Sequence, residues 1–256
     1  MMNTVIVLFL LAMGLSVGSF LNVCIYRLPR HESLLFPASH CPSCDRSLSW
    51  FENLPLVSWL VLRGRCRTCR TWIGVQYPLV EAITGAIFVS AFFIYGWTPL
   101  LAARLLFACA MIVLFVIDLH HRILPNVITL PGIVIGFVLS CFLPPGWRAS
   151  LIGLIAGGGV LFAIGEAYYR TRGYEGLGMG DVKMLAMIGA FLGWPLMLVT
   201  LVLASFAGSA VGIGLLVSRR GDMKAALPFG TFLAVGALVA AVAGNSFLDW
   251  YLTLYQ

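Results

Sequence analysis

Long apolar runs separated by short polar segments occupy most of this chain, and they limit its possible folds more than any other feature. A transmembrane helix needs about 17–25 mostly apolar residues in succession. Because the bilayer core holds no water to bond with the backbone, helices are the simplest spanning structure. We therefore expect an all-α polytopic membrane protein with about eight transmembrane helices, the sixth being short for a full crossing. The apolar runs cover residues 4–26, 78–96, 99–118, 126–143, 149–169, 184–195, 196–217 and 228–250.

The composition agrees with this class. Hydrophobic residues make up 61% of the 256 positions and charged residues only 10%, and the mean hydropathy is +0.98. A soluble domain is typically about 25% charged. The first run lacks a basic residue before Arg27 and exceeds the roughly 7–15 apolar residues of a signal peptide. We therefore expect residues 1–26 to form a retained first transmembrane helix.

The basic residues predict the orientation in the membrane. Of the 16 Lys and Arg residues, all except Arg104 and Arg148 lie in the segments 27–77, 119–125 and 170–183, or in 219–227. The positive-inside rule places these segments in the cytoplasm and the N-terminus outside. The net charge of +6 is thus mainly an orientation signal. No interleaved aromatic residues accompany it, so nucleic-acid binding is not expected.

The segment 27–77 is the only long polar stretch, and it contains two C-x2-C pairs. Two such pairs can complete a tetrahedral metal site with no further ligand, which is typical of structural zinc. Disulfides and a redox pair are the alternatives, but cytoplasmic thiols stay reduced. We expect a small zinc-ribbon-like domain at 27–77, followed by a membrane core at 78–256. The predicted ligands are Cys41, Cys44, Cys66 and Cys69.

Two carboxylates lie at the predicted cytoplasmic border of the membrane. Asp118 ends the third apolar run and Asp181 precedes the sixth, so both belong at the same depth. Two carboxylates about 3 Å apart share one proton. One can then deprotonate a water while the other donates to a scissile carbonyl, which is peptide hydrolysis without a covalent intermediate. Glycines would let a substrate strand approach Asp181 closely, and they stand at Gly176, Gly178 and Gly180.

Other interpretations of these groups remain open at this stage. Asp181 could simply cap the sixth helix. Glu81 and Glu166 are equally good candidates for a functional site, because both are ionisable groups within apolar runs. Both also lie close enough to the end of a run for their carboxylates to reach the membrane surface. Lys183 replaces the last glycine of a dinucleotide-binding motif, which disfavours that motif. Lys183 itself could orient the site or anchor its helix at the surface.

Glycines also recur at helix-packing distance in two of the later runs. Small residues four positions apart allow membrane helices to approach closely. We expect helix-packing contacts, rather than a function, at Gly153 and Gly157 and at Gly208 and Gly212.

Taken together, these motifs resemble the type IV prepilin peptidase family, nearly from end to end. The similarity is carried by "GSFLNVCIYRLPR" at 18–30, the two cysteine pairs, "NLPLVSWLVLRGRCR" at 53–67, "YPLVEAITG" at 77–85, "IDLHHRILPN" at 117–126 and "GLGMGDVKMLAMIGAFLG" at 176–193. Many family members carry an acidic residue where Asn126 stands, so a role for that position in proton handling is not expected here.

The resemblance implies a bifunctional enzyme of the bacterial inner membrane. Its members are aspartic endopeptidases of the GxGD kind, and the resemblance makes Asp118 and Asp181 the catalytic pair. They cleave the basic leader from prepilins or pseudopilins of type IV pilus and type II secretion systems, then N-methylate the new terminus with S-adenosylmethionine. Glu81 and the zinc loop are the candidates for methyl transfer, and a structural role is the alternative for both. The expected partners are these substrates and membrane lipid.

Two alternatives compete with this function. One is a peptidase that no longer methylates its product. The other is a proton-coupled transporter or a zinc-stapled membrane scaffold. A transporter needs a pathway on both faces of the membrane, whereas the predicted aspartates share one face and no inverted repeat is evident.

Overall fold

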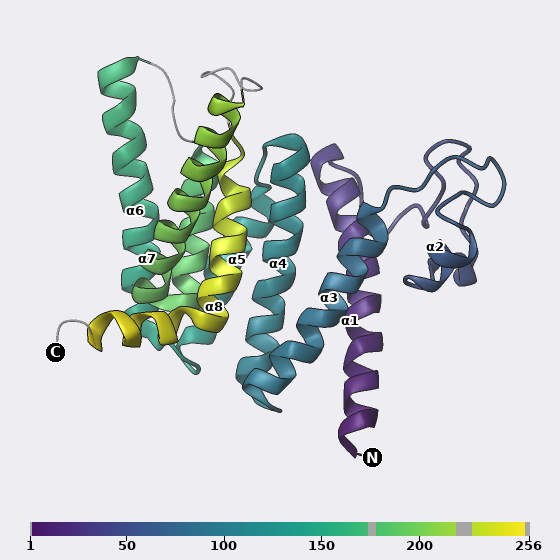
Figure 1. Cartoon of the computed structure of the whole chain (residues 1–256), viewed down its shortest axis with the longest axis horizontal. Helices are drawn as coiled ribbons and strands as arrows, with labels where there is room; N and C mark the ends of the chain where they lie inside the picture. The colour runs from purple at the N-terminus through teal and green to yellow at the C-terminus, as the bar shows by residue number, and fades with distance from the viewer. Residues whose placement is uncertain (1, 174–177, 219–226, 254–256) are drawn as a thin grey trace. The chain divides into compact units, whose positions relative to one another are not determined.

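A computed structural model describes residues 2–173, 178–218 and 227–253 of the chain (Figure 1). Over these residues the regular structure is helical, with only two isolated β-bridges, so the all-α expectation is confirmed. The helices are α1 (Met2–Arg27), α2 (Val57–Val61), α3 (Gln76–Tyr95), α4 (Pro99–His121), α5 (Asn126–Ser140), α6 (Trp147–Arg172), α7 (Met179–Val217) and α8 (Phe229–Thr253), with short 3-10 turns at Leu28–Arg30 and Trp50–Asn53.

Within the described residues, six helices are long and apolar enough to cross a membrane, which supports a multi-pass membrane protein. The helix α5 is also apolar but shorter, with 15 residues. The predicted sixth and seventh runs both lie in α7, where two helices are joined across a break close to the predicted boundary between the runs. That helix is interrupted at Gly193, which has φ 79° and ψ 169°. Glycine tolerates a positive φ, and Pro195 next to it cannot donate a helical hydrogen bond.

The chain divides into two compact units, residues 1–113 and 114–256, and α4 contributes to both. In the first unit α1 packs against α3 through glycines. A Cβ atom on Gly18 would lie 2.7 Å from the Cα atom of Glu81, and one on Gly14 would lie 2.8 Å from the Cα atom of Gly85. Only glycine permits so close an approach. This contact brings Glu81 directly against α1.

In the second unit, α7 packs against α5, α6 and α8 (Figure 1). A Cβ atom on Gly153 would lie 2.6 Å from the carbonyl oxygen of Gly189, and one on Gly157 would lie 2.7 Å from that of Leu185. The packing role predicted for this glycine pair is therefore confirmed. In the expected pair at 208 and 212, Gly208 lies against Phe232 of α8, and Gly212 lies against Leu227 in the segment just before α8.

Close to the break in α7, a buried carbonyl is satisfied by side chains. The carbonyl oxygen of Ala190 accepts hydrogen bonds from the hydroxyl groups of Ser140 and Ser150, at 2.9 and 2.7 Å. Ser140 ends α5 and Ser150 lies in the first turn of α6. Buried carbonyls are costly without partners, so these serines stabilise the interrupted helix and join three helices at one point.

Candidate functional site

Asp118 lies in the last turn of α4 and is only 4% exposed. Its Oδ2 atom accepts a hydrogen bond from the backbone N–H of Thr231, at 2.8 Å. Thr231 is in the first turn of α8, where backbone N–H groups have no partner within the helix. The carboxylate therefore sits at the N-terminus of α8, where the helix dipole favours negative charge. Sequence reasoning missed Thr231, because the donor belongs to its backbone.

Gly230 leaves the room that this hydrogen bond requires. A Cβ atom at this position would lie 2.9 Å from Oδ2 of Asp118 and 3.0 Å from Cδ1 of Leu124. The side chain of Leu124 also packs on Gly180, where an added Cβ would come within 3.0 Å of it. Leu124 thus lies between Gly230, which precedes the N–H donor of Thr231, and Gly180, which precedes the side chain of Asp181. A larger residue at either glycine would collide with it.

Asp181 is the third residue of α7 and is half-buried. Its carboxylate accepts a hydrogen bond from the backbone N–H of Gly178 and lies close enough to Asp118 for the two charges to interact. The first contact is a capping interaction of the kind left open by the sequence. The second brings together two carboxylates that lie far apart in the sequence but within the unit 114–256.

Lys183 has a defined partner in this site. Its Nζ atom donates to Oδ1 of Asn126 at 2.9 Å. Asn126 is the first residue of α5 and Lys183 lies in the first two turns of α7. The bond therefore holds the start of α5 against the start of α7, the helix that carries Asp181. Between the two possible roles of Lys183, this contact favours orientation of the site.

An apolar groove with a volume of about 610 Å³ lies beside Asp118 in the same unit. Thr231, whose N–H holds Asp118, is part of its lining. The rest of the lining is almost entirely apolar and comes from α4, α7 and α8 and the segment before α8. It includes Phe115, Leu119, Leu203, Ala207, Val211, Leu227, Val235 and Val239.

The four cysteines of the loop converge in the unit 1–113. Their sulfur atoms all lie within 4.8 Å of one another, and Sγ of Cys41 is 3.7 Å from Sγ of Cys69. Tetrahedral zinc with Zn–S bonds of about 2.3 Å places its sulfur atoms roughly 3.8 Å apart. All four thiols are free rather than joined in disulfides. The cluster could therefore hold one metal ion.

Both cysteine pairs use the same local backbone design. In each, the first cysteine accepts a hydrogen bond from the residue four positions later and donates to the residue five positions later. The residue after the second cysteine has a positive φ, 52° at Asp45 and 57° at Arg70. A β-bridge closes each turn, at His40–Ser47 and at Arg65–Trp72. The two turns are thus structural repeats, which present their sulfurs to a common centre.

Electrostatics within the cluster favour a cation. Hydrogen bonds from the hydroxyl and backbone N–H of Thr71 lower the pKa of Cys69 to about 6. Although the backbone N–H of Arg46 favours its thiolate, burial and the neighbouring Cys41 and Cys69 thiols raise the pKa of Cys44 to about 11. Several thiolates cannot ionise together without a compensating positive charge. A metal ion bound by all four would supply that charge.

Charged residues, of which Glu52 and Arg27 are buried, hold this loop in shape. Arg46 donates to the carboxylate of Glu52 at 2.6 Å, and the Glu52 side chain is only 2% exposed. The pKa of Glu52 is lowered, first by this hydrogen bond and then by the N–H of Ser49. Arg27, at the end of α1, donates to the carbonyl groups of Ser33 and Pro37 at 2.8 and 2.6 Å. The loop is therefore tied to itself and to α1.

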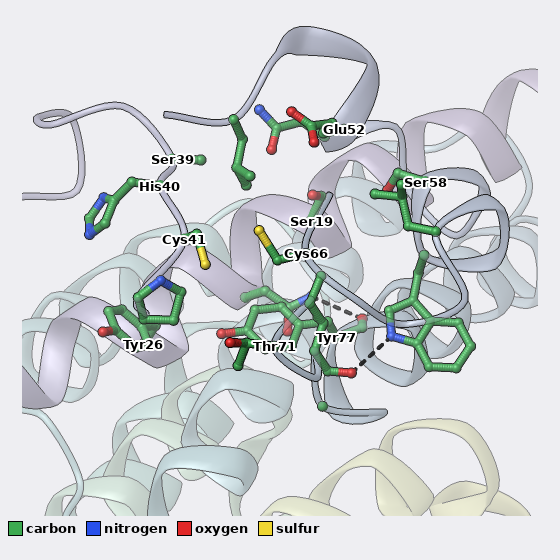
Figure 2. A pocket seen from close by; sticks show the side chains of 18 of the residues that line it. Ser19, Tyr26, Ser39, His40, Cys41, Glu52, Ser58, Cys66, Thr71 and Tyr77 are labelled. Atoms are coloured by element: carbon green, nitrogen blue, oxygen red, sulfur yellow. Dashed lines mark hydrogen bonds between the residues drawn. The ribbon is translucent and has the colours of Figure 1, made fainter. Parts of the chain in front are cut away.

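Glu81 and Glu166 have very different surroundings. Glu81 is 8% exposed, and its Oε2 atom accepts a hydrogen bond from the backbone N–H of Leu56 at 2.8 Å. It lines a cavity of about 350 Å³ that the cysteine loop also lines. Figure 2 shows other residues of this lining, among them Ser19 and Cys41. Glu166 instead forms an exposed pair with Arg170, at 2.7 Å along one face of α6. The structure therefore distinguishes the two residues as candidates for a functional site, because Glu81 lines this cavity and Glu166 forms an exposed ion pair.

Comparisons with known proteins cover both units. Residues 12–95 match the family model described as the bacterial Peptidase A24 N-terminal domain. Residues 105–213 match the model described as the type IV leader peptidase family. No solved structure matches the chain.

Three curated relatives carry the name prepilin leader peptidase/N-methyltransferase. The protein of Aeromonas salmonicida (strain A449) is 36% identical over 94% of this chain and 91% of its own length. That of Aeromonas hydrophila is 38% identical over the same shares. That of Myxococcus xanthus (strain DK1622) is 42% identical over 82% of this chain and 63% of its own length. The transporter and the peptidase without methyl transfer are not favoured by these relatives.

Proposed function

Because the chain belongs to the type IV leader peptidase family, we propose that it cleaves the basic leader from type IV prepilins or pseudopilins and N-methylates the new N-terminal residue. The similarity to relatives named for both activities supports this, since it extends over 94% of the chain. The protein would act in the inner membrane of a bacterium, with its N-terminus outside and the cysteine loop in the cytoplasm. This orientation follows from the distribution of basic residues.

Asp118 and Asp181 are the proposed peptidase pair. The observation that carries the proposal is that α4 and α7 bring two carboxylates within electrostatic reach in one unit, one of them buried. Carboxylates so placed share a proton and titrate as a pair. An aspartic mechanism needs this state, in which one group is a base while the other is an acid.

The contacts of the two residues suggest which group takes which role. The N–H of Thr231 and the N-terminus of α8 favour the ionised form of Asp118. Asp118 would accept a proton from water as the water oxygen bonds to the scissile carbonyl carbon. Asp181 would give its proton to the carbonyl oxygen. When the tetrahedral intermediate collapses, the C–N bond breaks, the leaving nitrogen takes a proton from Asp118, and a hydroxyl group of the intermediate returns a proton to Asp181 as the carbonyl re-forms.

The apolar groove beside Asp118 is the proposed site for the apolar helix that follows the leader. Thr231 belongs both to this groove and to the contacts of Asp118, so a helix in the groove would present its end to the aspartates. The glycines preceding Asp181 would leave room for the extended leader. The substrate would then be cut at the border between its polar and apolar parts.

The four cysteines are the proposed ligands of a structural zinc ion. Four sulfur ligands leave no open position for a substrate, so the ion would supply a cross-link and no chemistry. It would stabilise the segment 27–77 as a small cytoplasmic domain between the first transmembrane helix, 1–26, and the membrane core, 78–256. S-adenosylmethionine is the proposed methyl donor, as the names of the relatives imply.

A single incubation tests both activities. Purified enzyme is mixed with a prepilin and S-adenosylmethionine labelled in its methyl group, and the product is measured by intact mass. We expect loss of the leader and the mass increment of one methyl group. Leader loss without the increment would indicate a peptidase that no longer methylates, and an uncleaved substrate would refute the proposed peptidase.

A further inference from the structure

The cavity beneath the cysteine loop has the properties of a ligand site. It has a volume of about 350 Å³, within the range of roughly 300–1,000 Å³ for small-molecule pockets. Its lining combines apolar and aromatic side chains with a few polar groups. Figure 2 shows Cys41 and Cys66 at the same pocket as Glu52, Tyr26 and Tyr77. A ligand here would therefore touch both α1 and the loop that carries the cysteines.

Two buried polar residues of this lining could make a further interaction with a ligand. The first of them is Asn22. It is 4% exposed and donates through Nδ2 to the carbonyl of Tyr77 at 3.0 Å, but its Oδ1 atom is buried without a partner. A buried acceptor without a donor costs about 1–3 kcal/mol. A ligand that brings a donor would remove this cost, and Asn22 is among the residues that line the cavity.

Glu81 is the second group, and it adds a negative charge to the same cavity. Its contacts are the N–H of Leu56 and the hydroxyl of Ser19, both neutral. Among the described residues the ion pairs are Arg46–Glu52 and Arg170–Glu166, so Glu81 has no cationic partner there. A buried carboxylate is unfavourable without a positive charge to compensate it. Arg27 and Arg67 also line the cavity, so it is suited to a ligand that carries charges of both signs, with a cationic group at Glu81.

We propose that this cavity binds S-adenosylmethionine, with Glu81 compensating its positive charge and Asn22 accepting a hydrogen bond from it. The proposal rests on the methyl transfer proposed above, which requires such a donor. S-adenosylmethionine carries a sulfonium cation, an ammonium group, a carboxylate that can face Arg27 or Arg67, two ribose hydroxyl groups and a flat adenine ring. Its donors match the two acceptors, and its ring matches the aromatic part of the lining. The neutral product, S-adenosylhomocysteine, lacks the sulfonium charge.

Backbone geometry around Glu81 supports a prepared site. Leu56, whose N–H holds Oε2 of Glu81, has φ 59° and ψ −47°. A leucine adopts a positive φ only at a cost, and such residues often occur at functional sites. On the other side, Gly18 lets α1 lie against the backbone of Glu81. The carboxylate of Glu81 is thus held by Leu56 and its backbone lies against α1 before any ligand enters.

The test measures binding separately from catalysis. Full-length, metal-loaded enzyme in detergent is equilibrated with labelled S-adenosylmethionine or S-adenosylhomocysteine, and each Kd is determined by dialysis. We expect Glu81→Gln to weaken binding of the methyl donor by roughly tenfold or more, as loss of a charge-assisted contact implies. It should affect S-adenosylhomocysteine less. Ser19→Leu, which would place a larger side chain in the cavity, should weaken both ligands.

Glu166→Gln is the matched control, because it removes an intramembrane carboxylate that faces no described cavity. It should leave both Kd values unchanged, and leader cleavage by all three variants should stay near wild type. If Glu81→Gln fails to accumulate, ultraviolet cross-linking of labelled donor to the wild-type protein decides instead. The label should map to peptides within residues 12–81.

The outcomes separate this proposal from the proposed function. Wild-type enzyme that neither binds the donor nor methylates pilin would refute methyl transfer itself, and this site with it. Wild-type enzyme that methylates, together with unchanged donor binding in Glu81→Gln and Ser19→Leu, would overturn the site alone. Cross-linking to residues 114–253 would overturn the site in the same way.

Discussion

The two units of the molecule each bury a carboxylate in an apolar helix, but they surround it differently. In the unit 114–256, Asp118 meets a second carboxylate and an N–H at a helix terminus. In the unit 1–113, Glu81 meets neutral donors and a cavity. The first arrangement suits the exchange of a proton, and the second suits the binding of a positive group. Burial alone therefore does not define the role of a membrane carboxylate, since its neighbours decide it.

The units also differ in what holds them together. Both units pack helices through close glycine contacts, but in the unit 1–113 the cavity is also closed by a loop organised around four cysteines. We therefore expect changes in one unit to affect one activity and to leave the other nearly intact.

The largest expected effect is on leader cleavage. Asp118→Asn and Asp181→Asn should each reduce its rate by about 10²–10⁴-fold, the usual contribution of general acid–base catalysis. Donor binding and the amount of protein in membranes should not change. Asp249→Asn, which alters an exposed carboxylate in α8, is the control and should cleave normally. Full cleavage by both active-site variants would rule out the aspartic mechanism.

Removal of the proposed metal ion should have the opposite effect on the two activities. Cys41→Ser combined with Cys66→Ser leaves two of the four ligands, so the loop should lose its metal and its order. Methyl-donor binding should fall below detection while leader cleavage persists. Metal content by mass spectrometry and the two activity assays provide the measurements. Cys141→Ser, which changes an exposed thiol outside the cluster, should match wild type. Equal loss of both activities would show that the units are not independent.

Thr231→Pro should weaken cleavage by an intermediate amount. Proline has no backbone N–H, so this variant loses the hydrogen bond that Asp118 accepts. Proline is nevertheless tolerated in the first turn of a helix. A hydrogen bond to a charged group contributes about 1.5–3 kcal/mol, which corresponds to roughly 10–100-fold in rate. Thr231→Ala keeps the N–H and should cleave at a near-normal rate. If the two variants cleave equally well, the N–H does not support Asp118.

A smaller effect is expected in the groove. Ala207→Trp should partly fill it and raise KM for prepilin several-fold, with little change in kcat, because the substrate helix is bound less well. Val242→Trp changes an exposed position of α8 outside the groove lining and is the control. Steady-state kinetics with a prepilin in detergent would measure both. An unchanged KM in Ala207→Trp would place the substrate helix elsewhere.

The smallest effect concerns the bond between Lys183 and Asn126. Lys183→Met should lower the free energy of unfolding by about 1 kcal/mol, the usual net value of one hydrogen bond. Asn126→Asp should convert the bond to an ion pair and raise stability by up to about 1 kcal/mol. Unfolding in detergent measures both variants. When Asn126→Asp is combined with Lys183→Met, its stabilising effect should vanish, and an effect that persists would argue against this contact.

Features carried by side-chain type were visible in the sequence. The apolar runs, the cysteine pairs, the glycine contacts of α6 and α7, and the two aspartates all have a recognisable spacing or position. Features carried by the backbone were not visible. The N–H of Thr231 and the positive φ of Gly193 depend on conformation, which residue types alone do not fix, although the boundary predicted between the runs 184–195 and 196–217 lies close to this break of α7. The sequence likewise could not separate Glu81 from Glu166, because only the fold decides which of them faces a cavity.

The position of Leu124 between Gly180 and Gly230 has a consequence for the evolution of the family. One leucine side chain fills the space that a Cβ atom would need at either glycine. The side chains at these three positions share one space, so none of them can be replaced by a larger one unless another becomes smaller. Where a homologue acquires alanine at the position of Gly180 or Gly230, natural selection should favour a smaller residue at the position of Leu124. Such correlated substitutions would show that the space beside the aspartates keeps a similar size across the family.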